Sequence, residues 1–301
     1  MPRPDAPRPV VDAEHVPGRR AFFIDGRGVP TITVRGFRVY RGMDDSSGGG
    51  GAYVAGGSVI LEDNVIERCV ADTRGGGLFV ADGSLLLTAN TFERNVAQYG
   101  GGLYVDGGKV VLERNTFLRN EAPPSGGAIA LGGGKVTGAN NVVTENPLAG
   151  AGVYLMGGHL TARHWTLVNN GRYGVIADLG VDVDRGSVAL SKSIIASHQS
   201  GLFGSGAVGR QTLFHDVDHP CIAGASCVNN LFGDPKFVDP RGGDYHIRAD
   251  SAAVDQGYSL DVARDMDGDF RPVGAASDIG ADEIEPERTY VPLVLRRVGS
   301  R

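Results

Sequence analysis

Short apolar segments recur at a nearly constant spacing through the middle of the chain. Four of them can be superimposed: SVILEDNVIERC from Ser58, SLLLTANTFERN from Ser84, KVVLERNTFLRN from Lys109 and KVTGANNVVTEN from Lys135. Their asparagines lie 26, 25 and 26 residues apart, at Asn64, Asn90, Asn115 and Asn141. A second phrase recurs between them, as GGAYVAGG, GGLFVADG, GGLYVDGG, GGAIALGG and AGVYLMGG. A fixed step of this size, with Gly-rich turns, predicts a solenoid.

The pattern within one repeat predicts three short strands. In the first strand, apolar columns that begin at Val59 and Leu61 lie two residues apart, so both face the same side. A second strand carries the column of Ile66, and a third the columns of Ala52 and Val54. Equal columns at a fixed step mean that each strand pairs in parallel with its equivalent, at about 4.8 Å per coil. Runs between turns are too short for helices, so the sequence predicts an all-β parallel β-helix of about eight coils.

The regular pattern covers only part of the chain. Residues 1–20 are Pro- and Arg-rich and predict a disordered or loosely docked lead-in. The β-helix is expected over 21–230, with weaker repeats after Gly158, where Trp165 takes the place of the repeated asparagine. Residues 231–285 predict a last irregular coil and a cap that covers the open hydrophobic end of the stack, because a solenoid needs such a cover. Residues 286–301 form a tail.

Composition narrows the classes of function. Glycine makes up 47 of 301 residues without a Gly-X-Y period, which indicates turns and excludes collagen. The net charge of −6 argues against nucleic acid as a partner. No apolar run approaches the roughly 18 residues of a membrane span, and residues 1–20 contain no apolar core of a secretory signal. Cys221 and Cys227 enclose a short loop and form a disulfide if the protein is extracellular, while Cys69 is left over. We expect a monomer.

Two resemblances rest on longer motifs. The GGA or GGL phrases, together with Phe-x-x-Asn at Phe92–Asn95 and Phe117–Asn120, resemble the polymorphic outer-membrane protein repeat of bacterial surface β-helices. The run from Asp234-Pro235 through Asp255-Gln256-Gly257 and Asp265-Met266-Asp267-Gly268-Asp269 to Asp278-Ile279-Gly280-Ala281-Asp282-Glu283 resembles the choice-of-anchor (type Q) module that ends many secreted β-helix proteins. The resemblances imply a right-handed β-helix and an extracellular or cell-surface location.

Most recurring residues have a structural explanation. Asn64, Asn90, Asn115 and Asn141 are expected at a bend, where each amide bonds to the neighbouring coils. In the C-terminal run, Asp265, Asp267 and Asp269 surround a Gly turn and offer ligands for calcium, although the bidentate Glu of an EF-hand is missing. The alternative is a turn that is held by Arg271 paired with Asp255 or Asp278. His215 and His219 alternate along one strand face, but a metal site would need a further ligand.

One column offers a candidate binding surface. Tyr53, Phe79, Tyr104 and Tyr154, with Ile129 between the last two, alternate with the inward columns of the third strand and should point outward. An exposed aromatic strip can stack on sugar rings. The alternative is that the rings pack on one another as cross-strand pairs.

The function expected from the sequence is therefore a non-catalytic, secreted or cell-surface β-helix for adhesion or glycan binding. No nucleophile triad, P-loop or dinucleotide motif is present in the sequence, and no catalytic residue is assigned. The rival is a lyase or glycoside hydrolase acting on an acidic polysaccharide. A hydrolase needs two carboxylates facing one cleft, and Asp82 and Asp106 satisfy this only as stacked Asp-Gly turns would. No cofactor is expected apart from the calcium considered above.

Overall fold

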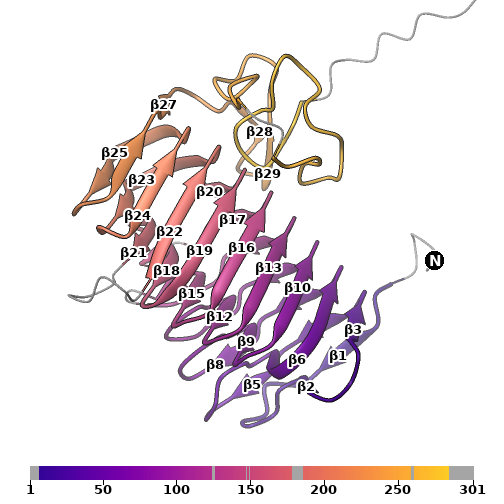
Figure 1. Ribbon diagram of the computed structural model, residues 1–301. Coiled ribbons are helices and arrows are strands. Elements are labelled where there is room, and N and C mark those ends of the chain that lie inside the picture. The colour runs from indigo at the N-terminus through magenta and orange to yellow at the C-terminus, as the bar shows by residue number, and fades with distance from the viewer. Residues whose placement is uncertain are drawn as a thin grey trace, which may run out of the picture.

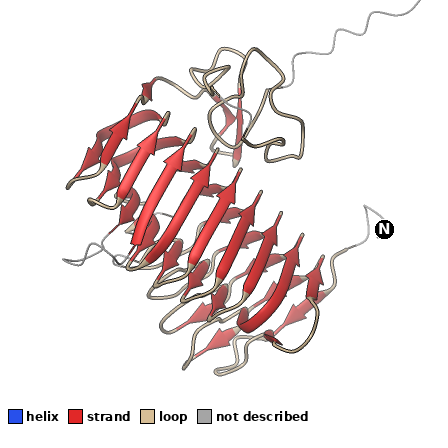
Figure 2. Cartoon of the chain, in the orientation of Figure 1, coloured by secondary structure: helices blue, strands red, loops and turns tan. Residues whose placement is uncertain are grey.

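A computed structural model describes residues 7–123, 126–146, 148, 150–177, 186–258 and 261–284. Strands and turns make up this part of the chain (Figure 2), and no helix in it is long and apolar enough to cross a membrane. A first stack of parallel strands consists of β3 (Ile32–Arg35), the second half of β6 (Ala52–Glu62), β10 (Ser84–Thr88), β13 (Lys109–Glu113), β16 (Lys135–Ala139), β19 (Gly158–Arg163), β22 (Gly186–Ser191), β24 (Ala207–Arg210) and β26 (Ser226–Val228).

Two further stacks complete each coil. The second consists of β1 (Val10–Asp12), β4 (Arg38–Tyr40), β7 (Val65–Glu67), β11 (Thr91–Glu93), β14 (Thr116–Leu118), β17 (Val142–Thr144), β20 (Thr166–Val168), β23 (Ile194–Phe203), β25 (Leu213–Ile222) and β27 (Leu231–Phe232). The third consists of β2 (Phe22–Gly26), the first half of β6, β9 (Leu78–Val80), β12 (Leu103–Val105), β15 (Ile129–Leu131), β18 (Ala151–Leu155), β21 (Tyr173–Ala177) and the last residues of β23 and β25. Two short strands, β5 (Met43–Asp44) and β8 (Val70–Ala71), pair beside them.

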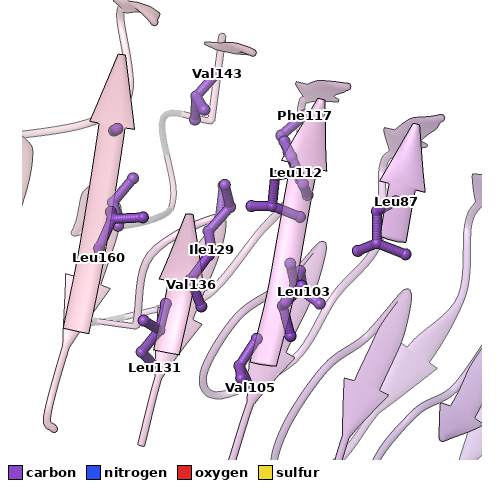
Figure 3. Packing of buried hydrophobic residues seen from close by; sticks show 14 of the residues in the cluster. Leu87, Leu103, Val105, Leu112, Phe117, Ile129, Leu131, Val136, Val143 and Leu160 are labelled. Carbon is purple, nitrogen blue, oxygen red and sulfur yellow. The ribbon is translucent and has the colours of Figure 1, made fainter. Parts of the chain in front are cut away.

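The strands stack in register, as the repeat predicted. Leu85 pairs with Val59 in the coil before it and with Val110 in the coil after it. The inward columns fill one continuous core, in which Leu87, Leu112 and their neighbours lie on top of one another (Figure 3). The predicted all-β parallel β-helix is confirmed.

The asparagine ladder forms as expected. Asn115 Oδ1 accepts hydrogen bonds from the backbone and side-chain amides of Asn90, at 3.0 and 3.1 Å, and Asn115 Nδ2 donates to the Leu87 carbonyl. A second ladder, built from the Phe-x-x-Asn motif, runs parallel to it at the next bend through Asn95, Asn120, Asn146 and Asn170. The residue before each rung is left-handed, with φ of 53° at Ala89 and 56° at Arg114. The two bends therefore recur coil after coil with the same geometry.

Trp165 ends the first ladder and lies fully inside the core. Its room comes from Gly138, which stands in the column of Leu87 and Leu112. A Cβ atom at Gly138 would lie 2.7 Å from the Trp165 ring, so no larger residue fits there without displacing it. The large residue of one coil is thus matched by a small residue of the preceding one.

The C-terminal segment lies along the side of the stack, whereas we predicted a cap across its open end. Its two antiparallel strands, β28 (Phe237–Asp239) and β29 (Asp244–Ile247), and the loops after them cover the ends of β17 and β20 (Figure 1). The cause is a second hydrophobic cluster between the segment and the outer face of the second stack, formed by Val142, Val168, Ile194, Ala196 and Leu213 on one side and Tyr245, Ile247, Ala253, Ile279 and Ala281 on the other.

The last coil contains a disulfide between Cys221 and Cys227, with Cα atoms 6.1 Å apart. Cys221 pairs with the core residue Leu202, and Cys227 pairs with Gly209 in the adjacent inward column. The bridge therefore joins the third stack to the first across the end of the core. Cys69 is a free, buried thiol, and burial raises its pKa to about 12.

The start of the chain is more ordered than predicted. Val10–Asp12 forms β1 and pairs with β4, so this part of the expected lead-in belongs to the first coil. The expected tail at 286–301 lies outside the described residues.

Candidate functional site

The aromatic column stacks ring on ring outside the main core. Centroids of Phe23 and Tyr53, of Tyr53 and Phe79, and of Phe79 and Tyr104 lie 5.4, 5.0 and 5.5 Å apart in nearly parallel planes. We predicted an exposed strip, but Phe79 and Tyr104 are only 5% and 2% exposed. The turn before β6 lies against Phe79, and the Arg74 guanidinium lies 5.1 Å from the Tyr104 ring. The faces of these rings are therefore occupied by protein.

The end of the column differs from the alignment of the repeats. Ala130, and not Ile129, is in register with Tyr104 and Tyr154, while Ile129 points into the core. Tyr53 and Tyr154 are half-buried, and the Tyr53 ring lies between the rings of Phe23 and Phe79. A sugar-binding role for the column stays a prediction.

A more open surface lies where the C-terminal segment meets the stack. Two hollows, of about 390 and 440 Å³, share Arg114 and Asn140, and together we call them the flank cleft. The first is lined by outward residues of β14 and β17, by the turn between β28 and β29, and by Met266 and Asp267. The second is lined by outward residues of β13, β16 and β19 and by residues 261–264. The cleft thus has a sheet as its floor and the C-terminal segment as its wall.

Arg114 stands at the junction of the two hollows. It occupies the left-handed position before Asn115, which directs its side chain away from the core. Among the described residues its guanidinium takes part in no hydrogen bond or ion pair, and the side chain is half-buried. A cation in this setting is available to a negatively charged group.

The wall of the second hollow is held by Asp261. Lys192 Nζ lies 2.5 Å from one Asp261 oxygen, and Arg163 Nε lies 3.3 Å from the other. His164, fully buried, lies 3.6 Å from the same carboxylate. Burial opposes ionisation of Asp261, but His164 and Lys192 outweigh it and hold the pKa of this carboxyl well below its ordinary value. Asp261 is therefore a structural anion that fixes the segment to the stack.

A second cluster of charge lies at the rim of the first hollow, around His246 in β29. His246 Nδ1 lies 2.5 Å from Asp244 Oδ1, and Nε2 lies 2.7 Å from Asp267 Oδ2. Burial lowers the pKa of His246, but these hydrogen bonds outweigh it and raise the pKa to about 9. Asp282 faces the same point from behind, and burial raises its pKa to about 6. The ligand atoms of His246, Asp267 and Asp282 all lie within 4.8 Å of one another, a spacing that can hold a metal ion.

The acidic turn that suggested calcium is divided between two roles. Asp265 Oδ1 accepts backbone N–H groups from Asp267, Gly268 and Asp269, and its other oxygen accepts the N–H of Glu283. One oxygen of Asp265 thus holds the turn together, and the other ties the turn to Glu283. Only Asp267 of the three predicted aspartates joins the cluster of possible metal ligands.

The partner of Arg271 also differs from our prediction. Its guanidinium pairs with Glu283 at 2.9 Å and donates to the backbone carbonyls of Asp278 and Gly280. The carboxylates of Asp255 and Asp278 instead accept backbone N–H groups, Asp255 from Ala276 and Asp278 from Asp255 and Ile284. The ion pair of Arg271 is therefore with Glu283, because backbone donors use the Asp278 carboxylate.

Sequence reasoning did not single out Arg114, His246 or Asp282. One signal was present: outward positions of the second strand turn apolar at Val142, Val168 and Ile194, and a strand with two apolar faces is covered on both sides. That signal predicts that another segment of the chain packs over this side of the stack, and that a cleft can form along the edge of that segment. The His246 cluster joins a residue of β29 with residues of two separate loops, and no local spacing reveals it.

Comparisons with known proteins concern the fold. The family model described as "Right handed beta helix region" matches residues 20–184, which is more than half of the chain. No curated protein matches the chain. Among solved structures, the one described as "Crystal structure of pectate lyase Pel9A" is similar at 15% sequence identity, over 89% of this chain and 87% of that chain, with a TM-score of 0.46.

Proposed function

We propose that this chain, which belongs to the right-handed β-helix family, is a non-catalytic, secreted or cell-surface protein that binds an acidic glycan in the flank cleft. The guanidinium of Arg114, which has no partner among the described residues, carries the proposal, because it stands where the two hollows meet. Arginine binds a carboxylate or another oxyanion through two parallel hydrogen bonds. A sugar that bears such a group, with its hydroxyls and its apolar ring face, fits a cleft lined by both polar and apolar residues on a hydrogen-bonded sheet.

The remaining charges of the cleft support a binding role without catalysis. Asp261 is bound by Lys192 and Arg163, and Asp244 and Asp267 are bound by His246. Carboxylates that already have cationic partners are poor bases and nucleophiles, whereas they hold the wall of the cleft in place. The Cys221–Cys227 disulfide supports a location outside the reducing cytosol.

The test compares Arg114→Ala with Arg68→Ala in binding to a polyuronate and to a neutral glucan. Alanine fits at 114 because Ala89 occupies the same left-handed position one coil earlier. Arg68 is exposed and left-handed but lines neither hollow of the flank cleft, so it is the matched control. A lost hydrogen bond to a charged group costs about 1.5–3 kcal/mol, so Arg114→Ala should weaken polyuronate binding roughly 10- to 150-fold. Equal affinity of both variants would refute the assignment.

Cleavage of an acidic polysaccharide is the second candidate. His246 favours it, because a group whose pKa is raised to about 9 carries a proton at neutral pH and lies at the rim beside Asp267. The two candidates differ in product. Release of reducing ends or of unsaturated sugars from a polyuronate, abolished in His246→Gln, would replace the binding proposal with an enzymatic one.

A further inference from the structure

We propose that His246, Asp267 and Asp282 bind one divalent transition-metal ion of the zinc type, which ties the hairpin of β28 and β29 to the end of the C-terminal segment. The site goes beyond glycan binding and does not depend on it. Its three ligands come from separate parts of the segment: His246 from β29, Asp267 from the acidic turn, and Asp282 from the loop at 281–284.

The geometry requires only small movements. Two ligands at about 2.1 Å from a tetrahedral metal lie about 3.4 Å from each other. The three ligand atoms lie within 4.8 Å of one another, and His246 Nε2 is 2.7 Å from Asp267 Oδ2. The metal would take the place of the proton that Nε2 shares with Asp267, so this pair separates slightly while Asp282 approaches.

Asp244 supplies the support that a histidine ligand needs. Metal-binding histidines usually donate their second ring N–H to a carboxylate, which fixes the ring and its tautomer. His246 Nδ1 lies 2.5 Å from Asp244 Oδ1, and the Asp244 carboxylate also accepts the backbone N–H of His246. The ring is therefore held with Nε2 turned toward Asp267 and Asp282.

Asp282 gives an independent indication of a ligand. It is only 5% exposed, and no ion pair to it is found among the described residues. Its Oδ2 accepts the Ile247 N–H at 2.8 Å, and its other oxygen accepts no hydrogen bond from any described residue. Burying a carboxylate is costly unless a cation or further hydrogen bonds complete its contacts. A bound metal ion supplies the contact that the second oxygen lacks.

The set of donors selects the kind of metal. One imidazole nitrogen and two carboxylates suit zinc or a similar ion, whereas calcium prefers six to eight oxygens. Asp265, which would have to join a calcium site, has both oxygens on backbone N–H groups. On its open side the cluster faces a hollow of about 420 Å³, which leaves room for a water as the fourth ligand.

The experiment titrates the full-length chain with Zn²⁺ and, in parallel, with Ca²⁺, by calorimetry and by thermal unfolding. The variants are Asp267→Asn, which removes one ligand, and Asp269→Asn, which lines the same hollow outside the cluster. We expect one Zn²⁺ per chain and a rise in Tm that a chelator reverses. Asp267→Asn should weaken Zn²⁺ at least tenfold, while Asp269→Asn should not.

Three results would overturn the proposal: no saturable Zn²⁺ binding by the unmodified protein, Ca²⁺ binding as tight as Zn²⁺ binding, or Zn²⁺ binding that Asp267→Asn leaves unchanged. The unfolding temperature in chelator shows whether Asp267→Asn is folded. Should that variant not fold, His246→Gln takes its place, and the titration of the unmodified protein decides by itself. None of these outcomes depends on glycan binding, so the two proposals fail separately.

Discussion

Protonation of the buried His198 should destabilise the β-helix in mild acid, and His198→Gln should remove that effect. His198 lies in β23 and continues the second asparagine ladder by one coil. Its Nε2 accepts the backbone N–H of Asn170 at 3.1 Å, where the earlier coils use an asparagine oxygen. A protonated ring has no lone pair at Nε2, so protonation breaks this bond and buries a charge in a residue that is 4% exposed.

Burial lowers the pKa of His198 from 6.5 to about 4. Between these values the unfolded chain binds a proton that the folded chain does not. The contribution of His198 to stability is therefore fully present above pH 6.5 and is lost as the pH falls toward 4. The difference between these two pKa values lowers the free energy of unfolding by about 2 kcal/mol between pH 8 and pH 5. The side chain of glutamine is long enough to place an acceptor oxygen where Nε2 lies, and it does not titrate.

The assay is urea unfolding at pH 8 and pH 5, followed by the fluorescence of Trp165, the single tryptophan, which is fully buried. The quantity of interest is the change in free energy of unfolding between the two pH values, compared between the unmodified protein and His198→Gln. Asp282 changes in the same interval, because burial raises its pKa to about 6, but its effect is common to both proteins and cancels in the difference.

His219→Gln is the control, since His219 is exposed and no ladder bond depends on it. We expect the control to lose as much stability at pH 5 as the unmodified protein, and His198→Gln to lose about 2 kcal/mol less. Equal acid losses in all three proteins would refute the idea that this rung titrates.

Two further predictions concern stability. Asn115→Ala removes four ladder hydrogen bonds at a fully buried position and leaves donors and acceptors of the neighbouring coils unpaired. The free energy of unfolding, measured with urea, should fall by about 3 kcal/mol. The exposed Asn229→Ala should change it little. A gain or no change at Asn115 would contradict the ladder's role. The double variant Cys221→Ser, Cys227→Ser should lose about 2 kcal/mol of free energy of unfolding, because the bridge spans 6 residues. Limited proteolysis of the variant should begin in the last coil. Cleavage that begins elsewhere would show that the bridge does not hold that coil.

The solenoid was predictable from the sequence because its physics is local and repeated. A column such as Val59, Leu85 and Val110 must face the core in every coil, and the Asn column must stand at every bend, so errors in one repeat are corrected by the next. The alignment failed by one residue only at Ile129, where the Gly phrase of that repeat offers no aromatic residue to mark the outward position.

The C-terminal segment could not be placed in the same way, because it occurs once. Its position depends on which outward residues of the stack are apolar, and Arg271 pairs with Glu283 because backbone donors already occupy Asp278. The His246 cluster depends in turn on that packing, since Asp267 and Asp282 reach His246 only after the segment has folded onto the flank. Local motifs identified the turn around Asp265 but not the side chains that converge beside it.

Because the disulfide holds the last coil, the residues that follow this coil are available for another role. A stack of coils is weakest at its ends, where the final layer has a neighbour on one side only. Here the Cys221–Cys227 disulfide joins the third and first stacks in the last coil, at positions that Leu202 and Gly209 occupy in the coil before. The residues after the disulfide need not cap the end of the stack. They fold back along its flank, where they build the wall of the flank cleft. Reduction of this one bond would therefore loosen the terminal layer first, while Lys192 and Arg163, which lie in earlier coils, would still hold Asp261 and the wall of the cleft.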